Sequence, residues 1–202
     1  MSRDAILAAA RTYQGVPCPL PTVPEFGPAS NDALLARFKE VLEQVGGRWV
    51  ERTAGGDLVG IVRQHYPDAT RIVSALEDLP ISTVTIGADS TPDQLVRIEL
   101  AILRGRVGVA ENAAVWVDEA QLPHRALPFV AEHCVLLLDP GNLVADMHAA
   151  YAALAGGDYG WGAFVSGPSK TADIEQALVI GAQGPRSLLV VFDSSGTSLT
   201  GA

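Results

Sequence analysis

The stretch of the chain richest in chemistry-bearing side chains reads Ser-Gly-Pro-Ser-Lys-Thr-Ala-Asp-Ile-Glu over residues 166–175, and Gly-Pro-Arg follows at residues 184–186. Cations beside hydroxyls and glycines suit a small carboxylate or phosphate, because the cations supply charge and the glycines let backbone amides approach closely. We expect a ligand-binding site for such an anion that includes Gly167, Ser169, Lys170, Thr171, Asp173, Gly184 and Arg186.

The same stretch is not a nucleotide-binding P-loop. That motif needs lysine and a hydroxyl residue directly after its second glycine, and here Pro168 and Ser169 intervene. The spacing predicts instead a turn from a strand into a helix over Thr171–Ile180, capped by Ser169 or Thr171. Lys170 would then stand at the positive end of the helix, where an anionic ligand would offset the like charge. The alternative is that Lys170 points into solvent and Ser169 only caps the helix.

Two further places combine polar residues with turns. Glu111 and Asn112 lie between two short apolar runs, and a partly buried Glu111 could act as a nucleophile or base. The alternative is a plain β-turn in which Asn112 adopts a left-handed conformation. His124 stands beside Arg125 in a loop bounded by prolines, where a ligand contact and an isolated surface histidine are both open. Asn112 and His124 are therefore further candidates for ligand binding.

Short apolar runs alternate with helical patterns after the first helix of the domain. Several strands, such as residues 188–192, are apolar on both faces, as in a parallel sheet covered by helices. The pattern predicts a three-layer, Rossmann-like α/β domain with a mostly parallel sheet over residues 30–202, preceded by an N-terminal helical arm and proline-rich connector over residues 1–29. The expected helices are 2–14, Ser30–Val45, Asp57–His65, Pro92–Arg104, Asn142–Leu154 and Thr171–Ile180. The expected strands are Arg48–Glu51, Arg71–Ser74, Val84–Ile86, Val107–Ala110, Ala113–Val117, Cys134–Leu138, Ala163–Val165 and Ser187–Phe192.

In open parallel sheets, ligands bind beyond the carboxyl ends of the strands. Three of the expected loops qualify, namely Ala110–Ala113, Asp139–Asn142 and Ser166–Thr171.

Composition narrows the classes of function. The net charge of −9 disfavours generic binding to nucleic acid or to anionic membranes. Two cysteines far apart and four scattered histidines fit a reducing cytoplasm and predict neither a disulfide framework nor a metal or iron–sulfur cluster bound by this chain. No apolar run has the length of a membrane span, so a soluble, cytoplasmic protein is expected.

The 166–175 stretch, Val-Ile-Gly at 179–181 and Gln-Gly-Pro-Arg at 183–186 resemble the C-terminal hallmark of the LUD-domain family, the lactate utilisation protein C group. More loosely, Glu111 falls where the family has Glu-Thr-Gly, and Arg125, Pro128 and His133 resemble another family segment. The resemblance implies a fold similar to sugar-phosphate isomerases and CoA transferases. It also implies association with iron–sulfur subunits that oxidise L-lactate to pyruvate, with the clusters on those partners.

The chain departs from the family pattern at two places. Asn112-Ala113 replaces Thr-Gly after Glu111, which puts a glycine-dependent backbone approach in question, and Gln183 replaces a histidine, so that no acid–base role carries over there. Two hypotheses follow. The first is an accessory or small-anion-binding subunit of a bacterial L-lactate utilisation system. The second is a stand-alone enzyme of the CoA-transferase or sugar-phosphate-isomerase type that uses Glu111 as nucleophile or base.

Overall fold

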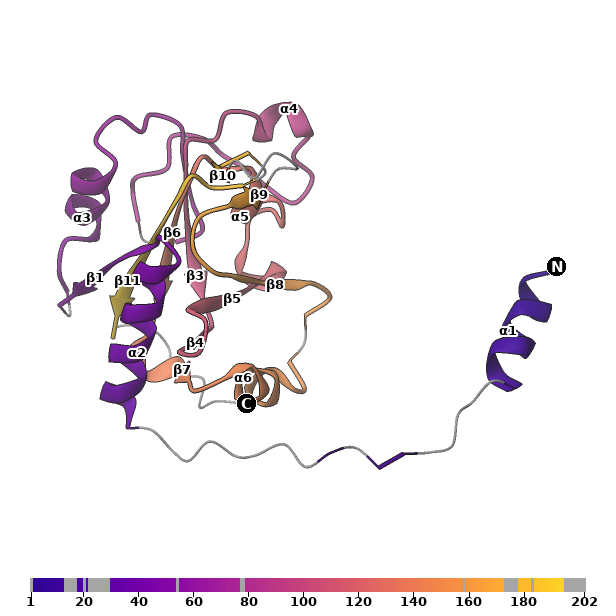
Figure 1. Cartoon of the computed structure of the whole chain (residues 1–202). Helices are drawn as coiled ribbons and strands as arrows, with labels where there is room; N and C mark the ends of the chain where they lie inside the picture. The colour runs from indigo at the N-terminus through magenta and orange to yellow at the C-terminus, as the bar shows by residue number, and fades with distance from the viewer. Residues whose placement is uncertain are drawn as a thin grey trace.

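A computed structural model describes residues 2–12, 18–19, 21, 30–53, 55–76, 79–157, 159–172, 178–182 and 184–194. Its main sheet has five strands in the order β1-β11-β6-β3-β2, and every neighbouring pair is parallel (Figure 1). The strands are β1 (Arg48–Arg52), β2 (Ile72–Ser74), β3 (Leu100–Gly105), β6 (His133–Leu138) and β11 (Ser187–Asp193). The strands with apolar residues on both faces, β6 and β11, lie at the centre, as their composition predicts.

A second sheet of four strands packs against the first. Its order is β7-β4-β5-β8, and its pairs are antiparallel apart from β4 with β7. The strands are β4 (Val107–Val109), β5 (Ala114–Asp118), β7 (Leu143–Val144) and β8 (Gly162–Val165). Val115 and Val117 of β5 join the core that covers one face of the main sheet, so this sheet forms part of an outer layer.

Helices complete the layers (Figure 1). Helix α2 (Asn31–Gln44), capped by the side chain of Ser30, buries Phe38 and Leu42 against one face of the main sheet. Helix α3 (Leu58–His65), capped by Asp57, covers the opposite face. Helix α6 (Met147–Leu154) packs on the outer side of the second sheet. The predicted three-layer α/β fold with a mostly parallel sheet is therefore confirmed. The N-terminal helix α1 (Arg3–Thr12) buries none of its residues.

Two predicted helices are shorter than expected. The helix predicted over Pro92–Arg104 stops after α4 (Pro92–Leu95), because Arg97 adopts a φ of +65° and the apolar residues that follow join the sheet as β3. The helix predicted from Asn142 starts only at Met147. Asp146 supplies its cap by accepting a hydrogen bond from the Ala149 N–H at 2.8 Å, and the residues before it form the 3₁₀ turn η2 (Pro140–Asn142) and β7. The predicted strand Val84–Ile86 is irregular.

The helix predicted over Thr171–Ile180 is wrong. Strand β9 (Lys170–Ala172) pairs with β10 (Leu178–Ile180) as an antiparallel two-stranded sheet. β-branched residues in both segments fit a pleated strand better than a helix, and local helix propensity is a weak prior that tertiary pairing overrides. Two short elements complete the described chain, η1 (Glu119–Gln121) and α5 (Leu127–Val130).

Candidate functional site

The loop after β8 and the start of β9 carry residues 166–170, the first half of the hallmark described above, which is called here the signature. Residues 184–186 are its second half. Gly167 is buried and has a φ of +66°, and a Cβ atom there would lie 2.8 Å from the carbonyl oxygen of Val45. Glycine is thus required twice, by the backbone conformation and by the close approach to the end of α2. Pro168, also buried, packs near Gly46, the first residue beyond the helix cap.

Backbone hydrogen bonds hold the two halves of the signature together. The Ser169 N–H donates to the Pro185 carbonyl at 2.8 Å, and the Ser169 carbonyl accepts from the Gly181 N–H at 3.0 Å. A Cβ atom on Gly184 would lie 3.1 Å from Cβ of Ser169, so a larger residue would push the two segments apart. Residues about fifteen positions apart in the sequence thereby share one wall.

A pocket of about 450 Å³, called here the signature pocket, opens along this wall. Its lining combines the polar residues Ser166, Ser169 and Lys170 with apolar side chains. The full lining is Val45, Pro128, Phe129, Phe164, Val165, Ser166, Gly167, Pro168, Ser169, Lys170, Gly184 and Pro185.

Lys170 does not stand at a helix N-terminus, because the helix expected there is the β9–β10 hairpin. Its Nζ lies 3.7 Å from the position that a Cβ atom on Gly46 would take, next to the C-terminal end of α2. A cation is favourable at that end of a helix. Its placement therefore has a structural reason of its own, while the exposed side chain still borders the pocket.

Glu111 and Asn112 belong to a neighbouring turn. The Ser166 hydroxyl donates to the Asn112 carbonyl at 2.7 Å, which ties this turn to the signature loop. The exposed Glu111 carboxylate accepts a hydrogen bond from the Met147 N–H at 3.2 Å, in the first turn of α6, and does not line the signature pocket. Ala113, not Asn112, takes the left-handed conformation, with a φ of +53°.

The other predicted residues lie apart from the pocket or outside the described side chains. His124 Nδ1 accepts from the Ala126 N–H at 3.1 Å and braces its own loop. Arg186 is exposed and pairs with Glu132 at 2.6 Å, outside the pocket lining. Thr171 lies in β9 with its side chain not described, and Asp173 is outside the described residues.

The expectation that three loops follow strands of the main sheet also needs correction. Only Asp139–Asn142 does so, after β6, whereas Ala110–Ala113 and Ser166–Thr171 follow strands of the second sheet. Gly184 to Arg186 lead into the first residue of β11, so the second half of the signature lies at the amino edge of the main sheet.

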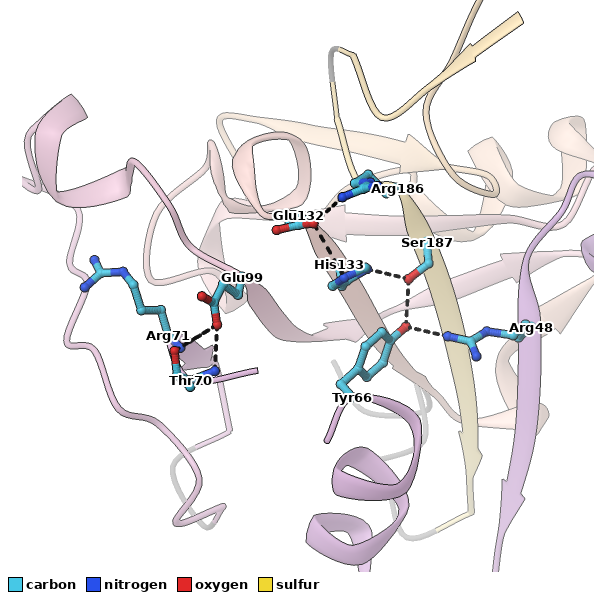
Figure 2. A network of polar contacts seen from close by, with 9 residues as sticks. All are labelled: Arg48, Tyr66, Thr70, Arg71, Glu99, Glu132, His133, Arg186 and Ser187. Atoms are coloured by element: carbon cyan, nitrogen blue, oxygen red, sulfur yellow. Dashed lines mark hydrogen bonds and ion pairs between the residues drawn. The ribbon is translucent and has the colours of Figure 1, made fainter. Parts of the chain in front are cut away.

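A polar network at this amino edge was missed by sequence reasoning (Figure 2). The Ser187 hydroxyl lies 2.8 Å from His133 Nδ1 and 3.1 Å from the Tyr66 hydroxyl, which accepts from Arg48 at 3.2 Å. Arg48, His133 and Ser187 each begin a strand, and a polar residue opening an apolar run was the available signal. Burial lowers the pKa of His133 and raises the pKa of Tyr66.

Figure 2 also shows Glu99, whose carboxylate accepts hydrogen bonds from the backbone N–H groups of Thr70 at 2.6 Å and Arg71 at 3.1 Å. These bonds to the charged form lower the pKa of Glu99. Burial raises the pKa of Cys134 to about 12, so this thiol is not a nucleophile at neutral pH.

Among the described residues, no group of three or more histidine, cysteine or acidic side chains is arranged to hold a metal ion. No helix in the described part of the chain is long and apolar enough to cross a membrane.

The protein has a Rossmann-like α/β fold, with a five-stranded parallel sheet and an attached mixed sheet. The two halves of the signature are in contact within this fold. The chain belongs to the LUD domain family, whose model matches residues 86–192. It is 27% identical over 185 residues to the lactate utilization protein C of Deinococcus radiodurans. This match covers 85% of each of the two chains. The fold is similar to the crystal structure of a DUF162 family protein from Deinococcus radiodurans, with a TM-score of 0.62 and 18% identity over 82% of this chain and 99% of the other.

Proposed function

We propose that this chain is an accessory, small-anion-binding subunit of a bacterial L-lactate utilisation system that acts with iron–sulfur partner subunits. The relationship to a protein named lactate utilization protein C, over most of both chains, supports the process. The iron–sulfur clusters belong, in this proposal, to the partners.

The observation that carries the proposal is the folding of both signature halves into the wall of one pocket. Ser169 and Lys170 provide hydroxyl and ammonium donors, which suit a carboxylate or phosphate, whereas the O–H of Ser166 already donates to the Asn112 carbonyl. Phe129 and Phe164 provide an apolar wall beside them. Such a mixture fits a small organic anion better than a bare ion.

Reconstitution tests the role in the system. The purified chain is mixed with the iron–sulfur subunits of its own source, and L-lactate oxidation and co-purification are measured with and without it. We expect the chain alone to be inactive and the partners to need it for full activity or assembly. The proposal is refuted if the chain does not co-purify with these subunits and the rate of L-lactate oxidation does not depend on it.

Variants test the signature pocket. Lys170→Gln should weaken binding of L-lactate or inorganic phosphate about tenfold, the loss expected for one charge-assisted hydrogen bond. Arg37→Gln is a matched control, because it removes one positive charge from the exposed surface of α2. Equal affinities for the two variants would remove Lys170 from the site.

The alternative function is a stand-alone enzyme with Glu111 as nucleophile or base. It is favoured by the turn at Ala113, which keeps a left-handed conformation where the family has glycine. The hydrogen bond from Met147 gives Glu111 a second, structural role as a partner of the start of α6. Under this alternative, wild type turns over acyl-CoA or phosphosugar substrates and Glu111→Gln does not. Under the accessory role, neither protein turns them over.

A further inference from the structure

A second pocket lies at the carboxyl edge of the main sheet, at the other end of its strands from Gly184 to Arg186. Its volume is about 400 Å³. The carboxyl edge of a parallel sheet is where α/β proteins bind their ligands. The lining is Arg52, Gly56, Asp57, Leu58, Val59, Leu76, Leu79, Pro80, Arg104, Leu137 and Asp193.

Strand register explains why charged residues gather there. Arg52 is paired with Asp193, Val191 with Leu137, and Leu137 with Arg104. Because side chains alternate along a strand, Arg52, Asp193 and Arg104 all project to the face that α3 covers. The same face is apolar further back along the strands, at Ile102, Val135 and Leu189. The apolar face thus ends in a set of charges at the carboxyl edge.

The two arginines of this pocket differ in their partners. Arg52 donates to Asp193 at 2.6 Å and to the Gly56 carbonyl at 2.8 Å, so its guanidinium is held and its charge is balanced. Asp57 accepts from the Gly60 N–H at 2.9 Å and caps α3. Arg104, half-buried, forms no ion pair or hydrogen bond with any described residue.

A half-buried guanidinium in a partly apolar pocket is costly unless an acceptor reaches it. Its fork of N–H groups matches the two oxygens of a carboxylate. Among the described lining residues, Arg104 is the cation without a partner, so it can offset one negative charge of a ligand, whereas a dianion would bring a second charge close to Asp57 and Asp193. Leu58, Leu76, Leu79 and Pro80 offer contact to a short apolar group.

We infer that the carboxyl-edge pocket binds a small organic monocarboxylate, with Arg104 as the residue that recognises its carboxylate. This site is separate from the signature pocket and does not depend on the proposed role in lactate utilisation.

Chemical-shift mapping by NMR on the intact chain tests the site without any mutation. The probes are acetate, propionate, pyruvate and L-lactate, with inorganic phosphate as the dianionic comparison. We expect saturable shifts of the backbone amides of residues 55–59, 76, 79 and 104. The inference is overturned if no monocarboxylate gives saturable shifts there, or if phosphate binds at this pocket more tightly than any of them.

Two substitutions then identify the recognising residue. Arg104→Gln should weaken monocarboxylate binding about tenfold or more, and Arg104→Lys, which keeps the charge but loses the fork, should weaken it less. Arg37→Gln and Lys170→Gln should leave affinity at this pocket unchanged. Unchanged binding by Arg104→Gln would overturn the inference. A loss caused only by Lys170→Gln would overturn it too, and would place the ligand in the signature pocket.

Discussion

His133 shows how a single titratable side chain couples this fold to pH. Its Nδ1 lies 2.8 Å from the Ser187 hydroxyl, its ring centroid lies 5.0 Å from that of Tyr66 at an interplanar angle of 38°, and burial lowers its pKa. The folded state therefore holds His133 neutral, while the unfolded chain takes up a proton near the ordinary histidine pKa of 6.5. Stability from this residue is present above pH 6.5 and is lost as pH falls through the lower, folded pKa.

Replacing His133 by glutamine should therefore flatten the acid side of the stability profile. Urea unfolding between pH 5 and 8 measures it: the free energy of unfolding of wild type should fall more steeply below pH 6.5 than that of His133→Gln. His65, whose pKa burial also lowers, leaves part of the slope in place. His148→Gln, on the exposed surface of α6, is the control and should keep the wild-type slope. A slope in His133→Gln that equals or exceeds that of wild type would contradict the assignment.

Ala113 shows what the family's glycine position requires of another residue. It is fully buried and has a φ of +53°. A left-handed conformation costs a residue with a Cβ atom about 1–2 kcal/mol. Glycine would remove that cost but also a buried methyl group, worth about 0.8 kcal/mol.

Ala113→Gly should accordingly be close to neutral in the free energy of unfolding. The matched control is Ala101→Gly, which removes an equally buried methyl group from an extended strand and should cost about 1–2 kcal/mol. Equal losses for the two variants would mean that the backbone of Ala113 is not strained.

At the scale of elements, the signature loop is fixed by its contact with the end of α2. Gly167 and Gly156 both have positive φ, of +66° and +81°, but differ in their surroundings. A Cβ atom at position 167 would meet the Val45 carbonyl oxygen at 2.8 Å, whereas at position 156 it would meet nothing within 4 Å. Substitutions at these two glycines therefore distinguish the cost of the backbone conformation, which both share, from the cost of a steric clash, which only Gly167 has.

Gly167→Ala should lower the free energy of unfolding by about 2–4 kcal/mol, the sum of conformational strain and a steric clash. Gly156→Ala should cost only about 1 kcal/mol, from strain alone. Thermal or urea unfolding of both variants provides the measurement, and ligand binding by Gly167→Ala should weaken as its loop shifts. If Gly167→Ala lowers the free energy of unfolding no more than Gly156→Ala does, then the loop relaxes away from the end of α2 without a cost.

The sequence predicted most elements but not how they pair. Apolar strands such as β6 and β11 are visible from composition, and the Ser30 cap marks the start of α2. The assignment of β4, β5, β7 and β8 to a separate sheet depends on contacts between distant segments, which periodicity does not record. The hairpin in place of a helix at 171–180 arises from the same kind of pairing.

For the candidate sites, sequence reasoning found the signature but not its full geometry. Gly167, Ser169, Lys170 and Gly184 do line one pocket. Arg186 is predicted in the same site, and Glu111 and His124 are predicted as separate candidates, yet each is engaged elsewhere, with Glu132, Met147 and Ala126 respectively. Arg104 is not among the predicted site residues, because the sequence pattern predicts a helix over Pro92–Arg104 and not the strand β3 that brings this side chain to the carboxyl edge.

At the scale of the whole molecule, the ion pair of Arg52 with Asp193 joins the ends of the first and last strands of the main sheet. The Asp193 side chain is 5% exposed and that of Arg52 is 18% exposed. Removing one partner of a buried pair leaves an uncompensated charge, which costs about 3–5 kcal/mol.

Asp193→Ala should therefore lower the free energy of unfolding by about 3–5 kcal/mol. Glu40→Ala, which breaks the exposed pair with Arg37, should cost less than about 1 kcal/mol. Urea unfolding at neutral pH compares the two. A similar, small cost for both would show that solvent screens the Arg52–Asp193 pair.

The place of β11 between β1 and β6 has a consequence for how the protein is made. Until residues 187–193 have left the ribosome, β1 and β6 each lack the partner between them, and the apolar faces around α2 and α3 stay incomplete. Folding of the main sheet must therefore wait for the synthesis of β11, whose pairing with β1 closes a loop of more than a hundred residues. Nascent chains that stop short of β11 should be clients of chaperones and proteases.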